Sequence, residues 1–97
     1  MVTMVVKKSD RAGKKLVAVF TKDNGRTKKT YFGQAGADDF LKTGNIDQRK
    51  RYRQRHKKDL ATGDPTRAGY LAYHLLWGDS KSLRQNISTY KSKFNLK

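Results

Sequence analysis

The sequence contains no cysteine and no glutamate, and it has a single proline among 97 residues. Without cysteine the chain forms neither disulfide bonds nor thiolate metal sites, which fits a reducing compartment. Long hydrophobic runs are also missing, because Lys7 and Lys8 end the apolar stretch that begins at Met1. This stretch is too short for a signal-peptide core or a membrane span, so we expect an intracellular protein with no membrane-spanning segment.

Positive charge dominates the composition. The chain has 23 Lys and Arg residues against 8 acidic residues, all of them Asp, for a net charge of +15. Such an excess repels itself, and a polyanionic partner relieves the repulsion through direct pairing and counterion release. We therefore expect an anionic partner, while DNA, RNA, anionic lipid and an acidic protein surface all stay open. The alternative is that the charge only keeps the protein soluble.

Length and composition predict the domain organisation. With 97 residues, 35% of them hydrophobic and 32% charged, the chain suits one small core with most residues at the surface. No repeat, low-complexity segment or long linker divides it. We predict a single compact basic domain over residues 1–97, of the α+β class. A small antiparallel hairpin or three-stranded sheet is expected first, followed by three helices.

The first third of the chain is rich in β-branched and aromatic residues. Residues 14–22 and 27–33 flank Asn24-Gly25, a dipeptide that suits the positive φ angles of a type I′ hairpin turn. Residues 1–8 are expected to add a third strand. Tyr31 and Phe32 are adjacent and therefore face opposite sides of the sheet, so at least one of them should pack in the core.

Capping residues and hydrophobic spacing predict the helices. Asn45 is a suitable N-cap for a helix over 46–60, and Asp64-Pro65 for a second helix that ends at Trp77. The second helix is apolar almost all round, which predicts a central position. Asp79 or Ser80 is expected to cap the third. Its apolar stripe consists of Leu83, Ile87, Tyr90 and Phe94.

The segment 49–58 is the first functional candidate, because seven of its ten residues are Lys or Arg and none is acidic. Such a helix can lay guanidinium and ammonium groups along a phosphate backbone, which gives affinity without sequence specificity. Arg49, Arg53 and Lys57 recur every four residues and predict one contact stripe. The pattern is also typical of a solvated surface helix. The predicted polyanion-binding residues are Arg49, Lys50, Arg53, Arg55, Lys57 and Lys58.

Aromatic residues close to basic ones are typical of platforms on which unpaired bases stack. Those of the second predicted helix also suit the core. Where the small core leaves them exposed, Tyr70, Tyr73 and Trp77 would form a patch for protein contact.

No catalytic or metal site is predicted. The two histidines, His56 and His74, lie in no zinc spacing and no triad motif. Asp38 and Asp39 would need a distant carboxylate to hold a metal ion, so a nuclease ranks last among the hypotheses. We therefore predict a protein that is not an enzyme and that needs no cofactor.

Several short motifs follow one another between Lys14 and Phe94. They are Tyr31-Phe32-Gly33, Gly36, Asp38-Asp39-Phe40, Lys50-Arg51-Tyr52, Arg55-His56-Lys57-Lys58, Asp64-Pro65, Ala68-Gly69, Leu75-Leu76-Trp77 and Ser82-Leu83-Arg84. In order and spacing they resemble a family of small basic proteins of uncertain function from large double-stranded DNA viruses of algae and amoebae. The family usually has more acidic residues before the Tyr-x-x-Arg-His segment than this chain has over 45–48.

The resemblance implies a viral protein packaged in the particle and present in the host cytoplasm or nucleus during assembly. Two functions stay open. The first is a structural virion component, a minor capsid or inner-shell protein able to contact polyanions. The second is a nucleic-acid-binding or genome-condensing protein acting through the 49–58 helix. The expected partners are capsid proteins or viral DNA, with an acidic protein surface as a further possibility and the oligomeric state open.

Overall fold

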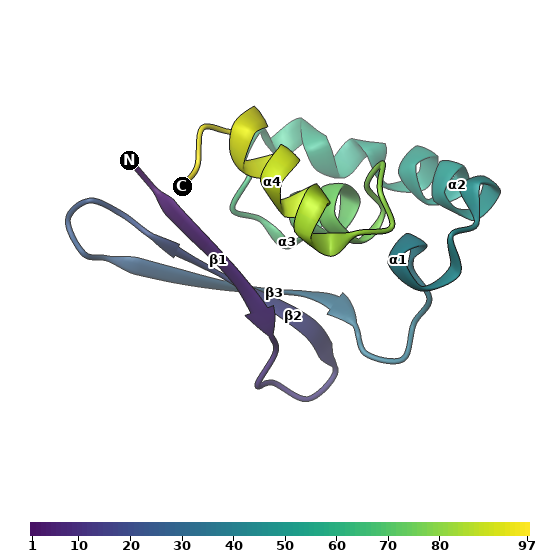
Figure 1. Ribbon diagram of the computed structural model, residues 1–97, viewed down its shortest axis with the longest axis horizontal. Helices are drawn as coiled ribbons and strands as arrows, with labels where there is room; N and C mark the ends of the chain where they lie inside the picture. The colour runs from purple at the N-terminus through teal and green to yellow at the C-terminus, as the bar shows by residue number, and fades with distance from the viewer.

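The computed structural model describes all residues from Met1 to Lys97. Its N-terminal part is an antiparallel sheet in the order β1-β2-β3, and helices follow it along the chain (Figure 1). The strands are β1 (Thr3–Lys8), β2 (Lys14–Thr21) and β3 (Thr27–Gln34). The predicted α+β class, with a three-stranded sheet preceding the helices, is confirmed.

One face of the sheet carries the core. Because side chains alternate along a strand, Met4, Ala18, Phe20 and Phe32 point to the same side, and all four are buried. Tyr31, on the other face, is only partly buried. The prediction that Tyr31 and Phe32 divide between the two faces, with one in the core, is therefore correct.

The hairpin between β2 and β3 differs from the prediction. Among Asp23, Asn24 and Gly25 only Gly25 has a positive φ, of 84°. The Gly25 N–H donates to the Lys22 carbonyl at 2.9 Å, and the Lys22 N–H donates to the Arg26 carbonyl at 2.8 Å. This is a three-residue loop with a left-handed glycine, not a type I′ turn. The Asn24 side chain explains the difference, because its Oδ1 accepts a hydrogen bond from the Arg26 N–H at 3.0 Å.

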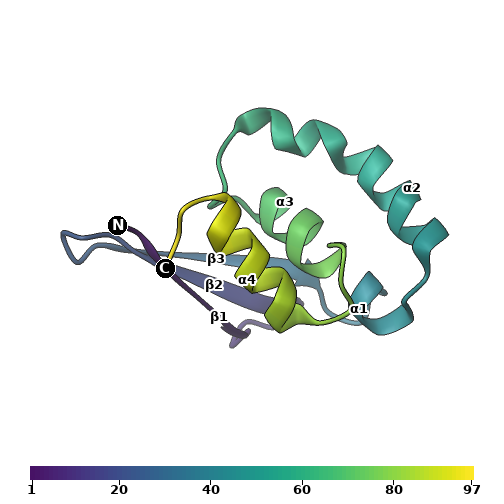
Figure 2. The same ribbon diagram turned by 45° about the horizontal axis from the view of Figure 1, so that its top comes forward.

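The helices form a second layer over the sheet. They are α1 (Phe40–Thr43), α2 (Ile46–His56), the 3₁₀ helix η1 (Lys57–Thr62), α3 (Ala68–Leu71), the π-helical segment η2 (Ala72–Leu76) and α4 (Leu83–Lys93). Since η2 follows α3 directly, the two make one helix, which lies between α2 and α4 (Figure 2). Tyr70, Leu71, Leu75 and Leu76 are buried on it. The predicted central position of this helix is confirmed.

The cap of α2 agrees with the prediction, but its end does not. The Asn45 Oδ1 accepts a hydrogen bond from the Gln48 N–H at 3.0 Å. The α-helix then ends at His56, and Lys57 and Lys58 lie on η1 instead of continuing it. A His56–Asp59 side-chain contact of 3.1 Å and the left-handed Gly63, with φ of 65°, accompany this tighter winding.

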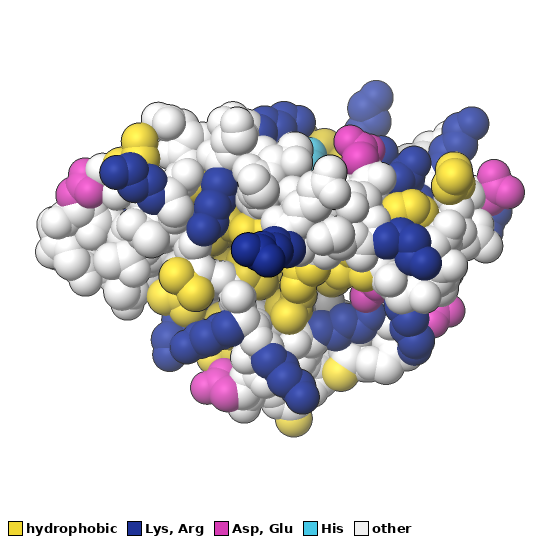
Figure 3. Space-filling model, in the orientation of Figure 1, with side chains coloured by type: hydrophobic (Ala, Val, Ile, Leu, Met, Phe, Trp, Pro, Cys, Tyr) yellow, Lys and Arg dark blue, Asp and Glu magenta, His cyan; other side chains and the backbone are white.

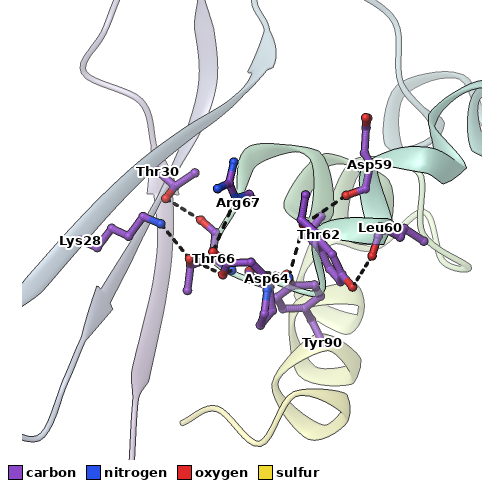
Figure 4. A network of polar contacts seen from close by, with 11 residues as sticks. Lys28, Thr30, Asp59, Leu60, Thr62, Asp64, Thr66, Arg67 and Tyr90 are labelled. Atoms are coloured by element: carbon purple, nitrogen blue, oxygen red, sulfur yellow. Dashed lines mark hydrogen bonds and ion pairs between the residues drawn. The ribbon is translucent and has the colours of Figure 1, made fainter.

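The central helix begins at Ala68 and not at Asp64-Pro65 as predicted. The Asp64 Oδ1 instead accepts from the N–H and the hydroxyl of Thr66, at 2.9 and 2.6 Å, and so closes a turn. The Thr30 hydroxyl donates to the Thr66 carbonyl at 2.7 Å, and Lys28 Nζ donates to the Thr66 hydroxyl at 2.8 Å. This turn therefore ties β3 to the helical layer (Figure 4).

Ser82 caps α4, and not Asp79 or Ser80 as predicted, by accepting from the Gln85 N–H at 3.2 Å. The reason lies in Asn86, which is buried. Its side-chain amide donates to the Leu75 and Ser80 carbonyls, at 3.0 and 2.8 Å, and its carbonyl accepts from the Ser80 N–H at 3.1 Å. Ser80 is thereby held in the connection that precedes the helix.

The expected surface patch of Tyr70, Tyr73 and Trp77 does not form. Tyr70 and Trp77 retain only 9% and 6% of their surface and belong to the core, while Tyr73 is partly buried. The central helix contacts β3 on one side and α2, η1 and α4 on others, so its aromatic residues are needed inside the small core. None of the helices combines the length and the hydrophobicity that a membrane crossing requires.

Candidate nucleic-acid interface

Helix α2 carries most of the basic segment and stands at one side of the helical layer (Figure 2). None of its residues is fully buried, so the helix is held by a narrow contact face. The residues that lie on that face decide which basic side chains remain available to a partner.

Arg49 and Arg53 point inward. Arg53 Nε donates to the Trp77 carbonyl at 2.8 Å, and an Arg49 guanidinium nitrogen donates to the Gly78 and Asp79 carbonyls at 3.2 and 3.3 Å. These carbonyls follow the C-terminal end of the central helix, where backbone acceptors lack helical partners and positive charge is favourable. The two arginines therefore hold the end of that helix, and of the predicted contact stripe of Arg49, Arg53 and Lys57 only Lys57 has a side chain without an intramolecular partner.

Tyr52 lies between these two arginines and fixes α2 to the core. Its ring stacks on Trp77 with a centroid distance of 4.4 Å and an interplanar angle of 10°, and on His56 at 4.2 Å. Burial raises the pKa of the Tyr52 hydroxyl above its usual value, and the nearby Asp59 carboxylate adds to this. Tyr52 therefore remains neutral and its ring is already engaged in packing.

The opposite side of α2, continued by η1, presents the free cations. We call Lys50, Arg51, Arg55, Lys57 and Lys58 the basic ridge. All of them are exposed, and none forms a hydrogen bond or an ion pair. Figure 3 shows Lys and Arg side chains projecting from the end of the molecule where α2 lies. The structure thus brings four predicted residues together with Arg51, which the sequence prediction omitted.

The angular position of each residue around the helix axis could have identified Arg51 as part of the exposed basic surface. Successive residues of an α-helix turn by about 100°, so Arg51 lies roughly opposite Arg49 and Arg53. A prediction that placed Tyr52 and one arginine stripe toward the core would have placed Arg51 outside. The basic residues alone do not show which side faces inward.

Most of the aspartates are engaged away from the ridge. Ion pairs join Asp38 to Lys42, Asp39 to Lys15, Asp64 to Arg67 and Asp79 to Arg53, and the Asp59 carboxylate lies 3.1 Å from the His56 ring. The Arg53 hydrogen bond lowers the pKa of Asp79, whose carboxylate stays charged. Asp47, in the first turn of α2, is exposed and forms no ion pair, so the ridge faces solvent with five cations and this one free carboxylate on the same helix.

The aspartate and histidine side chains outside α2 do not come together in a catalytic or metal site. Asp39 caps α1 by accepting from the Lys42 N–H at 2.9 Å, so its carboxylate holds the fold locally. His74 packs against Tyr70, Tyr90 and Phe94, and burial lowers the pKa of its imidazole to about 4. The structure contains no group of three metal-ligating side chains.

A cleft of about 620 Å³ lies beside the ridge. One wall is α2, the other is the start of β2 with the connection 33–39, and the central helix forms the floor. Arg55 belongs both to this lining and to the ridge. The cleft and the ridge are therefore adjoining parts of one surface.

Comparison with known proteins adds a family and a relative. Residues 4–56 match the model described as a family of unknown function (DUF5754). An uncharacterized protein of Acanthamoeba polyphaga mimivirus is 37% identical over 78 residues, which cover 74% of this chain and 78% of that protein. No solved structure matches the chain significantly. The family match contains the sheet except Thr3 and all of α2, so it includes the start of the basic ridge.

Proposed function

The chain belongs to the family of unknown function DUF5754, which links it to an uncharacterized mimivirus protein, and from this premise we propose that it binds nucleic acid through the basic ridge. In this role it contacts the phosphate backbone and does not read the bases. It works by binding and performs no chemical step. The viral relative makes viral DNA the first nucleic acid to test.

The basic ridge carries this proposal. Its five side chains are exposed and unpaired, and they project from a helix that the rest of the fold already holds in place. Free Lys and Arg groups on a rigid element gain phosphate contacts without first giving up an intramolecular partner. The net charge of +15 adds long-range attraction to a polyanion.

A capsid-bridging role has less support. That hypothesis depended on an exposed aromatic patch, and Tyr70 and Trp77 are buried. The most exposed large hydrophobic residues, Met1, Val5 and Ile46, lie on different elements and supply no equivalent aromatic surface. The surface is thus better suited to a polyanion than to an apolar protein face.

The test compares two variants that lose the same charge. The ridge variant carries Lys50→Gln, Arg51→Gln, Arg55→Gln and Lys58→Gln. The control variant carries Lys7→Gln, Lys22→Gln, Lys29→Gln and Arg84→Gln, all exposed and outside every ion pair. Affinity for a labelled DNA duplex and a labelled single strand is measured by fluorescence anisotropy, and circular dichroism checks the fold.

We expect the ridge variant to lose affinity by at least about tenfold and the control variant to lose much less, because local phosphate contacts add to the effect of net charge. Equal losses in both variants would show that net charge, and not the ridge, determines binding. Negligible binding of the wild-type protein at physiological salt would overturn the proposed function.

A further inference from the structure

The cleft beside the ridge combines an apolar floor with a polar rim. Phe32, Leu76 and Trp77 line its inner part, and Tyr52 stands on the α2 wall. A volume of about 620 Å³ is within the range of pockets that bind small organic groups.

The rim of the cleft carries charges of both signs. Of its carboxylates, Asp38 pairs with Lys42 and Asp39 with Lys15, while Asp59 lies 3.1 Å from the His56 ring. Lys14 on one wall and Arg55 on the other form no ion pair. Two unpaired cations therefore line opposite walls of the cleft, where they can contact the phosphate of a group whose other part is aromatic.

Arg55 connects the cleft to the ridge. A strand whose phosphates lie along the ridge passes Arg55 at the mouth of the cleft. A second hollow of about 640 Å³ adjoins the cleft and shares Asp59, Ala68 and Gly69 with it. Lys28 and Arg67 line this second hollow. Basic residues thus line both hollows.

We propose that the cleft receives an unpaired nucleotide of a single strand whose backbone lies on the basic ridge. The base lies against the apolar floor, within reach of the Gln48 amide, whose oxygen already accepts from the Thr43 hydroxyl at 3.0 Å and whose nitrogen offers a donor. The adjoining phosphate contacts Arg55 and Lys14. A duplex keeps its bases paired and stacked, so it uses the ridge alone. This inference rests on the proposed function, because the ridge brings the strand to the cleft.

Trp77 provides a direct readout, because it is the only tryptophan and it lines the cleft. Three probes are titrated against its intrinsic fluorescence: a single-stranded deoxythymidine oligomer, a DNA duplex of the same length, and heparin as a polyanion without bases. We expect the single strand to change Trp77 emission and to bind about tenfold more tightly than the duplex, since burial of a base in the cleft adds to the backbone contacts. Heparin should bind and leave the emission unchanged.

A matched pair of substitutions separates the cleft from the ridge. Ala68 is exposed and lines the cleft, whereas Ala61 is exposed on η1 and lines none of the cavities. Ala68→Phe fills the cleft, so it should remove the single-strand preference and preserve heparin binding. Ala61→Phe adds the same side chain and should change neither.

Each alternative result has a defined meaning. Equal affinity for both DNA forms with unchanged Trp77 emission, or wild-type behaviour of Ala68→Phe, would overturn the nucleotide site and leave the ridge intact. Failure of all three probes to bind would overturn the proposed function and this inference together. Displacement of the oligomer from the cleft by poly-aspartate, with the same sensitivity to Ala68→Phe, would assign the cleft to an acidic protein segment and overturn the nucleotide assignment.

Discussion

Arg53 on α2 and Trp77 at the end of the central helix are joined by a hydrogen bond of 2.8 Å from the guanidinium Nε to the backbone carbonyl. The same guanidinium reaches the Asp79 carboxylate at 2.9 Å. Asp79 is 89% exposed, so solvent screens the ion pair and the carbonyl contact contributes more. The most basic helix of the chain thus contributes arginines to the fold itself.

We predict that Arg53→Ala destabilises the protein by about 2 kcal/mol, because it removes a charge-assisted hydrogen bond to a partly buried carbonyl. Arg51→Ala, on the outer side of the same helix, should change the free energy of unfolding by no more than about 0.5 kcal/mol. Asp79→Asn should likewise cost little. Urea unfolding followed by circular dichroism measures all three, and equal effects of Arg53→Ala and Arg51→Ala would contradict the inward position of Arg53.

We predict that the C-terminal end of the central helix requires glycine at position 78. A Cβ atom at this position would lie 2.2 Å from the His74 carbonyl oxygen and 2.8 Å from Asn86 Cγ. The first contact is with a backbone atom. The second is with a buried side chain that forms three hydrogen bonds, so neither group moves easily. Gly78→Ala should cost roughly 3 kcal/mol.

Gly36→Ala is the control for this prediction. Its added Cβ meets open space, and only the positive φ of 83° opposes it, which should cost about 1 kcal/mol. Thermal unfolding of both variants compares their losses of stability. A Gly78→Ala protein as stable as Gly36→Ala would mean that the helix end shifts freely, which the contacts of Asn86 argue against.

The sheet and the central helix could be predicted because local pattern determines them. Segments rich in β-branched and aromatic residues flank Asn24-Gly25, and the stretch before Trp77 is apolar almost all round, so both elements follow from local composition and spacing. The turn type and the helix start could not be predicted. They depend on the side-chain hydrogen bonds of Asn24 to Arg26 and of Asp64 to Thr66, which compete with the expected turn and cap.

The basic segment could be predicted as a candidate site, but not the direction in which it faces. A spacing of four residues places Arg49 and Arg53 on one stripe, and that stripe is equally consistent with an inner and an outer face. The choice depends on Tyr52 stacking on Trp77 and on the carbonyls of residues 77–79. These partners lie more than twenty residues away in sequence, so no local rule reveals them.

The lowered pKa of His74 predicts that the stability of the fold depends on pH. Burial, with a smaller contribution from the positive charges of Lys93 and Arg53, lowers this pKa from 6.5 to about 4, and Asp79 opposes this weakly. Between pH 6.5 and about 4 the unfolded chain binds a proton that the folded protein does not, so stability falls as pH falls through this range. Because His74 is only partly buried, we expect a loss of roughly 1 to 2 kcal/mol.

The variant His74→Phe isolates this effect. It keeps an aromatic ring among Tyr70, Tyr90 and Phe94 and removes the titrating group. The difference in unfolding free energy between wild type and variant, measured in urea at several pH values, should change across this range and be constant above it. A constant difference at every pH would show that His74 titrates alike in the folded and unfolded protein.

The last prediction concerns the salt dependence of DNA binding. Each phosphate contact to a duplex contributes about 0.9 to the slope of log affinity against log salt concentration. Lys58 is exposed and unpaired on the ridge, so Lys58→Gln should reduce that slope by about 0.9. It should weaken binding to different duplex sequences equally, because a phosphate contact carries no sequence information.

Arg49→Gln is the informative comparison, since Arg49 lies on the same helix and loses the same charge. Its guanidinium already donates to the Gly78 and Asp79 carbonyls and lies over the Phe40 ring at 4.4 Å. We therefore expect a slope close to that of the wild type, measured by anisotropy between about 50 and 200 mM salt. A slope reduced as much as in Lys58→Gln would mean that Arg49 leaves the helix end to contact phosphate, and that nucleic acid reaches the inner side of α2 as well as the ridge.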